Sequence, residues 1–385
     1  MLNVLALVPD YVEKPSGGLG EQFRNIMNFL DTKVNYYICG YLEKNNLINY
    51  KSVINPFFEF NHAALNTIFG QSLYFQKALE HKANFDIIHA FDWSTFASGV
   101  LCSWHLKKPL ICTVQLSLHQ LNQTGIFYCH DPNTIDGKSI NDLQIYFEAF
   151  GLEYANRIIH VSQYYADKYP QFKHKSETLY NGLNINEWIP KNKPNLPGKN
   201  KNKFCYIGRA SPMKGLELIF NSQIPEDIDF YFVVSPKNSE EPYFSLIKKM
   251  CNNRNIFHIP GLYGQDKVDF LFSMDGVVMP SRHEPFGIVA LEALISENLF
   301  ITTANGGIKE IVQDIEYFHI NSSEDLFKSF LIASNLSDAD KKRIKQKGKE
   351  RALNFDWKII SEKLYNIYLE VRNEKYHRNR IMGCG

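Results

Sequence analysis

The stretch MPSRHEPFGIVALEAL, Met279 to Leu294, decides how this chain is interpreted. It places two carboxylates, those of Glu284 and Glu292, on either side of seven mostly apolar residues. A segment of this composition is predicted to be buried, and a buried charge is costly unless it is paired or used. We therefore expect both carboxylates to have a specific task.

The surrounding sequence predicts a strand-to-helix turn at this point. The run DGVVMP, Asp275 to Pro280, is typical of a buried strand, and the run after Gly287 is typical of a helix that ends near Ile295. Such a turn would bring Glu284 close to the backbone N–H groups of Phe286 to Ile288. A helix N-terminus of this kind favours anions.

Length and composition indicate a globular protein of two domains. The chain has 385 residues, which suits two domains better than one. Hydrophobic residues make up 44% and charged residues 22%, both ordinary values. The formal net charge of +1 argues against nucleic acid as the main partner.

The cysteines and the apolar runs predict a cytoplasmic protein. The seven cysteines are scattered and form no C-x-x-C pair, which indicates a reducing compartment. We find no signal peptide and no apolar run long enough to span a bilayer. Two basic segments, 191–203 and 341–351, are interpreted as solvated surface. Attraction of these segments to the inner membrane surface is the alternative.

Strand-like and helix-like segments alternate through both halves of the chain, which predicts α/β domains with doubly wound parallel sheets. We expect a first Rossmann-like domain over 1–188, a Pro- and Lys-rich linker over 189–202, and a second Rossmann-like domain over 203–355. Ligands of such sheets bind beyond the carboxyl ends of the strands. We expect the cleft between the two domains to hold the site.

Three further segments follow predicted strands on this side. KPSGGLGEQ opens the first helix with glycines that allow close backbone approach. YIGRASPMKG carries Arg209 and Lys214, two cations that can clamp a diphosphate. TTANGGIKE contains a second glycine pair, Gly306 and Gly307.

Together these motifs resemble the retaining glycosyltransferases of the GT-B fold, including the glycogen and starch synthase-like and group 1 enzymes of families 4 and 5. FDIIHAFDW also resembles the His-x-x-Asp-Trp segment of the synthases. One departure concerns the next strand end, where Gln115 stands in place of a histidine that contacts the donor sugar. The resemblance implies that the first domain, 1–188, is the acceptor side and that the second, 203–355, binds the nucleotide sugar. It also implies that a helix over about 356–376 packs back onto the first domain.

The resemblance also implies roles for individual residues. We expect Glu284, Arg209 and Lys214 to be catalytic. Three residues form a weaker acceptor-side set: His89, Asp92 and His119. The donor would be bound by Gly17, Gly18, Leu19, Gln115, Asn181, Ser235, Leu262, Tyr263, Phe286, Gly287, Ile288, Glu292, Gly306 and Gly307.

The expected activity is transfer of a hexose, glucose by preference, from a UDP-sugar to a glycan, lipid-linked or small-molecule acceptor, with retention of configuration. We expect no cofactor and no metal, because the two D-x-D strings, at 227–229 and 338–340, precede a strand and a helix. A synthase that uses ADP-glucose is the nearer alternative. A sugar-nucleotide epimerase and a non-catalytic carbohydrate-binding protein are alternatives of other classes.

Overall fold

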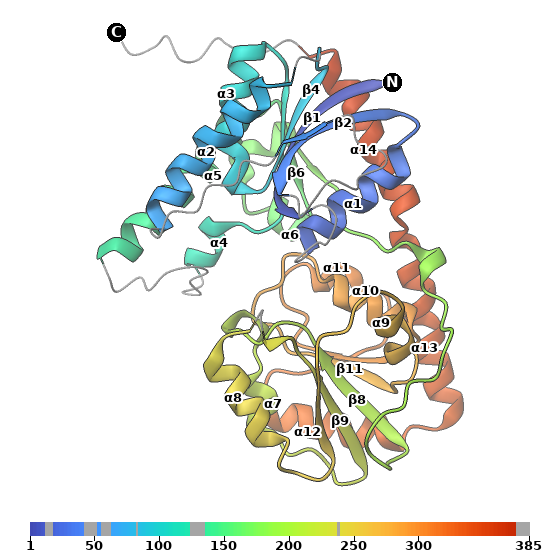
Figure 1. The fold of residues 1–385 in the computed structure, drawn as a ribbon. Helices are drawn as coiled ribbons and strands as arrows, with labels where there is room; N and C mark the ends of the chain where they lie inside the picture. Colours follow the sequence, from blue (N-terminus) through green and yellow to red (C-terminus); the bar gives the residue numbers. More distant parts are fainter. Residues whose placement is uncertain are drawn as a thin grey trace. The chain divides into compact units, whose positions relative to one another are not determined.

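The computed structural model describes residues 1–11, 18–41, 52–54, 63–81, 84–123, 135–236 and 239–374. The chain divides into two compact units (Figure 1). The first contains Met1–Asn181 and Trp357–Gly385, and the second contains Gly182–Asp356.

The first unit is built on a parallel sheet of seven strands in the order β3-β2-β1-β4-β5-β6-β7. The strands are β1 (Leu2–Tyr11), β2 (Val34–Tyr41), β3 (Ser52–Ile54), β4 (Ile87–Phe91), β5 (Leu110–Val114), β6 (Arg157–His160) and β7 (Ser176–Thr178). Strands β4 and β5 are buried along their whole length, as expected of a sheet covered on both faces.

Helices cover both faces of this sheet. In Figure 1, α2, α3 and α5 lie on one side of it, and α1 and α14 lie on the other. The helices are α1 (Gly18–Leu30), α2 (Ala63–Leu79), α3 (Trp93–Leu106), α4 (Leu118–Gln123), α5 (Ile135–Tyr154), α6 (Gln163–Ala166) and α14 (Trp357–Arg372).

Helix α14 packs on the first unit although it follows the second unit in sequence. Its Tyr368 hydroxyl lies 2.7 Å from Nδ1 of His89 on β4. Near its C-terminal end, Glu374 pairs with Arg157 on β6 at 2.5 Å. Its apolar residues form one face, which the contact with α1 and the sheet buries.

The second unit repeats the architecture with six parallel strands in the order β10-β9-β8-β11-β12-β13. The strands are β8 (Asn202–Ile207), β9 (Ile228–Val233), β10 (Ile256–Ile259), β11 (Gly276–Met279), β12 (Leu299–Thr302) and β13 (Phe318–His319). The helices are α7 (Glu217–Phe220), α8 (Glu241–Met250), α9 (Gly264–Leu271), α10 (Ile288–Ile295), α11 (Ile308–Ile311), α12 (Ser323–Asn335) and α13 (Asp338–Ala352).

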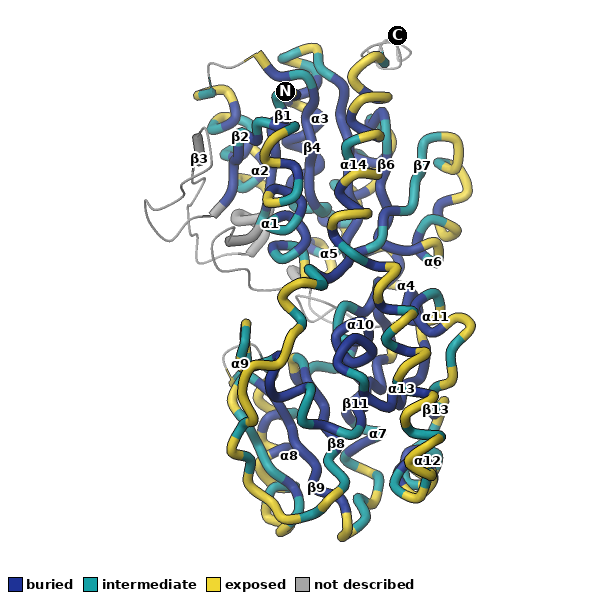
Figure 2. The backbone as a smooth tube through the Cα atoms, turned by 90° about the vertical axis from the view of Figure 1, so that its right-hand side faces the viewer, coloured by how far each residue is buried: buried dark blue, intermediate teal, exposed yellow. Residues whose placement is uncertain are grey.

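Burial follows the layers of this unit. Figure 2 shows the central strands buried and the outer faces of α12 and α13 exposed. Aromatic rings fill the core: Phe230 packs edge-to-face against Phe232 and Phe330, with ring centroids 5.0 and 5.9 Å away. The prediction of doubly wound parallel-sheet domains is confirmed for both units.

The Pro- and Lys-rich segment 189–202, expected to be a linker, belongs to the second unit and is hydrogen-bonded within it. The N–H groups of Lys191 and Asn192 donate to the carboxylate of Asp269, at 2.7 and 3.1 Å. Further along, the N–H of Asn200 donates to Asp229 at 2.9 Å. Asp229, the second acid of one D-x-D string, is therefore buried as a backbone anchor.

Gly151 marks a tight helix crossing in the first unit. A Cβ at this position of α5 would lie 2.3 Å from the Cβ of Phe96 on α3. We expect Gly151→Ala to lower the free energy of unfolding by about 1–3 kcal/mol, because the helices must separate. The matched control is Gly70→Ala on α2, where nothing lies within 4 Å. It should raise stability by about 0.5–1 kcal/mol, since alanine favours a helix. Denaturant unfolding of both variants measures this, and equal effects would contradict the packing argument.

Candidate functional site

The carboxylate of Glu284 is the centre of a cluster at the carboxyl edge of the second sheet. Strand β11 ends at Met279, and Glu284 lies in the loop before α10 with 8% of its surface exposed. Nζ of Lys214, from the loop after β8, lies 2.6 Å from its Oε2 atom. The hydroxyl of Ser281 donates to the same oxygen at 3.3 Å. The predicted cation and the predicted acid, 70 residues apart in sequence, therefore form an ion pair.

Arg209 and Tyr206 belong to the same cluster. Arg209 is exposed, and its carbonyl oxygen accepts a hydrogen bond from the Tyr206 hydroxyl at 2.5 Å. Burial raises the pKa of Tyr206, Glu284 raises this pKa further, and Arg209 lowers it. Glu284 and Arg209 therefore both influence the pKa of the buried Tyr206 hydroxyl. Tyr206 was not predicted, because an aromatic residue within a strand gives the same signal as ordinary core packing.

Glycines hold the backbone of the Glu284 loop in place. The N–H of Gly307 donates to the carbonyl oxygen of Glu284 at 2.9 Å, and a Cβ on Gly306 would lie 2.1 Å from that oxygen. A Cβ on Gly215 would lie 2.0 Å from the carbonyl oxygen of Pro280. Gly306 and Gly307, both predicted to bind the donor, therefore also fix the loop of Glu284, and the N–H of Gly307 is donated within the protein.

The N-terminus of α10 lies beside this loop. Gly287 is its N-cap, with a φ of 107° that favours glycine, and no side chain caps the helix. Ile288 begins the helix, and the buried ring of Phe286 packs 5.8 Å from that of Phe355. Residues 286–288 are predicted to bind the donor through their backbone N–H groups. The packing of the Phe286 side chain fixes the backbone at this point.

Glu292 is about one turn beyond Ile288 on α10 and is buried, with 5% of its surface exposed. Its Oε1 atom lies 2.5 Å from Nζ of Lys267, on α9. This lysine was not identified from the sequence, because its distance of 25 residues from Glu292 gives no local signal.

The loops after β9 and β10 meet at Ser235 and Tyr263. A Cβ on Gly261 would lie 3.0 Å from the Ser235 Cβ and 3.3 Å from the Tyr263 hydroxyl. The Tyr263 side chain is 66% exposed, and Leu262 beside it is half-buried. The structure thus places together the residues predicted to cradle a base.

In the first unit, the predicted glycine loop opens helix α1. Gly18 and Leu19 are its first residues, whereas Gly17 lies outside the described residues. Gln115, after β5, is buried and donates from Nε2 to Oε1 of Gln22 on α1. This contact joins the loop after β5 to the helix that follows the glycine loop. Gln22, which accepts the hydrogen bond, was not predicted from the sequence.

His89 and Asn181 are both buried in this unit. Nδ1 of His89 lies 2.7 Å from the Tyr368 hydroxyl, and Nε2 lies 2.7 Å from the Thr113 hydroxyl. Burial lowers the pKa of His89 to about 3, so the ring is neutral. This environment gives His89 a packing role. Asn181, after β7, is 4% exposed, and its Oδ1 atom accepts no hydrogen bond within the described chain.

Asp92 occupies a strained position at the end of β4. Its φ is 67°, which is unusual for a residue other than glycine, and its carboxylate accepts the N–H of Trp93 at 3.0 Å. Burial raises its pKa to about 7, the N–H of Trp93 lowers this pKa, and Glu148 raises it. The N–H of Leu116 is a further hydrogen-bond donor to this carboxylate.

A second buried acid holds the same loop. Glu148, on α5, is 2% exposed and accepts the N–H of Leu118 at 2.6 Å and the hydroxyl of Ser117 at 3.0 Å. The Tyr169 hydroxyl also donates to it, and His119 lies close to this network, with its ring 6.4 Å from that of Tyr169. Glu148 gave no sequence signal, because nothing in its local sequence distinguishes it from Asp142 and Glu153 of the same helix.

Comparison with known proteins identifies the class of protein. The model for glycosyl transferases group 1 matches residues 189–351, and the model for glycosyltransferase family 4 matches residues 20–187. The chain therefore belongs to the group 1 glycosyltransferases and is a transferase enzyme.

Individual proteins resemble it over almost its full length. A protein described as uncharacterized glycosyltransferase YqgM, from Bacillus subtilis (strain 168), is 23% identical over 97% of this chain and 99% of its own. The sucrose-phosphate synthase of Thermosynechococcus elongatus matches with a TM-score of 0.78 at 17% identity, over 96% of this chain and 99% of that one. Anabaena Alr3699/HepE, solved in complex with UDP-glucose, matches with a TM-score of 0.71 at 17% identity, over 96% of this chain and 100% of that one. At these identities the solved structures show the fold, which is GT-B.

The basic helix α13 is largely neutralised by its neighbours. Lys349 pairs with Glu297 at 2.6 Å, Lys347 with Glu316 at 3.6 Å and Lys345 with Asp275 at 3.7 Å. In the part of the chain that the structure describes, no helix has the length and apolarity needed to cross a membrane.

The raised pKa of Asp92 predicts a pH-dependent effect on stability. In the unfolded chain the carboxyl ionises near its ordinary pKa of 3.8, whereas in the folded chain it retains its proton up to about pH 7. Folding is therefore increasingly disfavoured as pH rises through this window. We expect Asp92→Asn to gain melting temperature relative to wild type between pH 4 and pH 8. The exposed Asp142→Asn serves as control, and an Asp92→Asn difference that is independent of pH would contradict the argument.

Proposed function

We propose that the protein is a metal-independent, retaining glycosyltransferase that moves a hexose, glucose by preference, from UDP-sugar to a glycan, lipid-linked or small-molecule acceptor. The observation that carries the proposal is the Lys214–Glu284 ion pair at the carboxyl ends of β8 and β11, with Arg209 beside it. It gathers two cations and an acid where parallel sheets bind ligands.

The cations would bind the donor diphosphate. Lys214 has three N–H donors, and one is used by Glu284, so its ammonium can also donate to a phosphate oxygen. Arg209 is exposed and offers a planar fork to the second phosphate. The N-terminus of α10, at Ile288, would add its dipole. These groups stabilise the negative charge that develops as the diphosphate leaves.

Glu284 would orient the sugar. Its contacts with Lys214 and Ser281 both use Oε2, so Oε1 can accept a hydrogen bond from a sugar hydroxyl. In the same-face mechanism that the resemblance implies, the departing phosphate oxygen takes the proton of the acceptor, and no carboxylate has to attack the sugar. Glu292 would accept hydrogen bonds from the ribose hydroxyls, and Ser235 and Tyr263 would cradle the base.

The neighbour solved with UDP-glucose supports UDP as the nucleotide. Gln115 in place of a histidine favours a transferase over a polymer-forming synthase that uses ADP-glucose. Asp92 and His119 would serve the acceptor, since both lie near the loop that follows β5. A panel of nucleotide sugars in a thermal-shift assay tests the donor, because a bound ligand raises the melting temperature by mass action.

We expect Glu284→Ala, Arg209→Ala and Lys214→Ala each to lower turnover by roughly 100-fold or more, because each removes a group that acts on the transition state. Turnover is measured as transfer or hydrolysis of the donor selected by thermal shift. Lys349→Ala is the matched control, since it removes an equally short ion pair of the same unit, outside the cluster. Near-normal rates in all three site variants would refute the assignment.

We also expect full activity in excess EDTA. The proposed charge stabilisation comes from Arg209, Lys214 and a helix N-terminus, and none of these needs a divalent cation. Initial rates with and without EDTA measure the effect. Complete loss in EDTA that added Mg²⁺ restores would overturn the metal-free mechanism.

A further inference from the structure

Lys267 places a full positive charge against the carboxylate of Glu292. Glu292 lies within the apolar helix α10, IVALEALI, and its side chain is 7% exposed. Its Oε1 atom is 2.5 Å from Nζ of Lys267, whose side chain is 27% exposed. Exposed ion pairs contribute little to stability, but a charge buried to this extent requires compensation.

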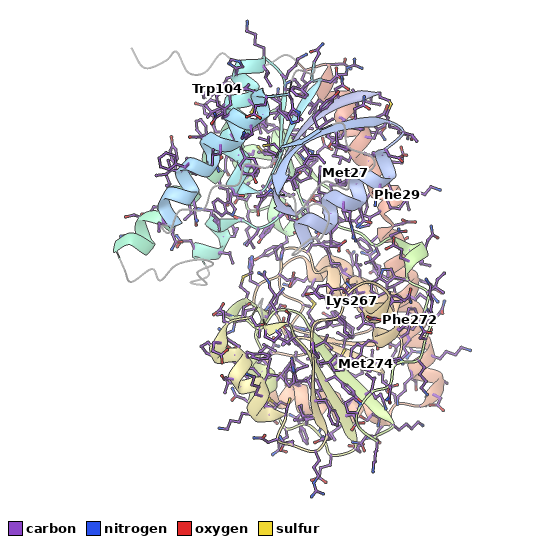
Figure 3. All side chains as sticks on the ribbon, in the orientation of Figure 1. Met27, Phe29, Trp104, Lys267, Phe272 and Met274 are labelled. Atoms are coloured by element: carbon purple, nitrogen blue, oxygen red, sulfur yellow. The ribbon has the colours of Figure 1, made fainter. Side chains whose placement is uncertain are left out.

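The helix that carries Lys267 is itself fixed to the chain that enters the second unit (Figure 3 labels Lys267). Nζ of Lys267 lies 5.8 Å from the centre of the Trp188 ring. On the same helix, Gln265 donates to the carbonyl oxygen of Ile189 at 3.1 Å, and Asp269 accepts the N–H of Lys191 at 2.7 Å. The ammonium is therefore held from two sides, by the indole face and by the carboxylate.

We propose that Lys267 is a positioning residue that makes the nucleotide site selective for the ribose diol. The inference rests on the proposed function, in which Glu292 accepts hydrogen bonds from ribose hydroxyls. The ammonium fixes Oε1, which leaves Oε2 of Glu292 in one orientation for a hydroxyl donor. A nucleotide that lacks these hydroxyls leaves a buried carboxylate oxygen without its partner, and such a loss weakens binding.

The role of Lys267 differs from that of Lys214. Lys214 would contact the donor itself, whereas Lys267 acts through Glu292. Removal of Lys267 leaves the carboxylate without its compensating charge and without a fixed rotamer. The expected consequence is loss of preference between ribose and a sugar without hydroxyls, and binding of the diphosphate is retained.

Calorimetric titration of the full chain with UDP and ADP, each beside its 2′,3′-dideoxy form, tests the inference. Wild type is expected to bind the ribonucleotide on the order of 10- to 100-fold more tightly than its dideoxy form, since hydrogen bonds to charged groups carry this magnitude. In Lys267→Met, the two forms should bind with similar affinity. Lys267→Arg should restore the preference, because its guanidinium can also reach the carboxylate.

Two further variants keep the test decisive. Lys349→Met removes the 2.6 Å pair with Glu297 and should leave the ribose preference intact. If Lys267→Met does not fold, Lys267→Met combined with Glu292→Gln removes both charges, and it should bind both nucleotide forms alike.

A ribose preference that survives in Lys267→Met would overturn the inference while the proposed function stands. A ribose preference that survives in the variant with Glu292→Gln would overturn the proposed role of Glu292 together with the inference. A wild type that binds UDP or ADP with no preference for ribose would also overturn the inference. A wild type that binds no nucleoside diphosphate would overturn the proposed function together with the inference.

Discussion

The ion pair between Lys214 and Glu284 is the interaction on which the candidate site depends. A carboxylate that is only 8% exposed is costly to bury, and the ammonium at 2.6 Å compensates it. The pair also fixes two loops that follow different strands, because Lys214 comes after β8 and Glu284 after β11. A parallel sheet brings such loops to one edge, so the fold and the chemistry arise from the same constraint.

The sequence was sufficient to predict the sheets and the loops that carry the site. Buried parallel strands read as apolar runs, and polar residues that follow them stand out, as Arg209 and Glu284 do. The short strands β3 and β13 gave no such signal because they have only three and two residues at the sheet edges. Edge strands of this length bury little and leave no periodic pattern.

Other parts of the site could not be predicted because they depend on tertiary contacts. His89 has the same sequence appearance as a strand-end functional histidine, but Tyr368, 279 residues away, closes over it. Gly307 is predicted to bind the donor, and the sequence gives no sign that its N–H is donated to the carbonyl oxygen of Glu284. Lys267 and Glu148 lie on helices whose sequences do not tell whether these two side chains are exposed to solvent or packed in the core. Contacts between side chains of different helices and strands decide whether such a residue is buried or paired. The residues next to it in the sequence do not reveal these contacts.

The glycine contacts around Glu284 have a consequence for how such an enzyme diversifies. Gly215 and Gly306 lie so close to the carbonyl oxygens of Pro280 and Glu284 that any larger residue would displace the loops that carry the candidate site. Between the loops at Ser235 and Tyr263 the nearest neighbours of a Cβ on Gly261 are side-chain atoms, the Ser235 Cβ at 3.0 Å and the Tyr263 hydroxyl at 3.3 Å, and Tyr263 is 66% exposed. Substitutions near Ser235 and Tyr263, where the base is expected to lie, can therefore be tolerated without a change in the loop of Glu284. New donor preferences would thus evolve from the rim of the site, with its catalytic centre inherited unchanged.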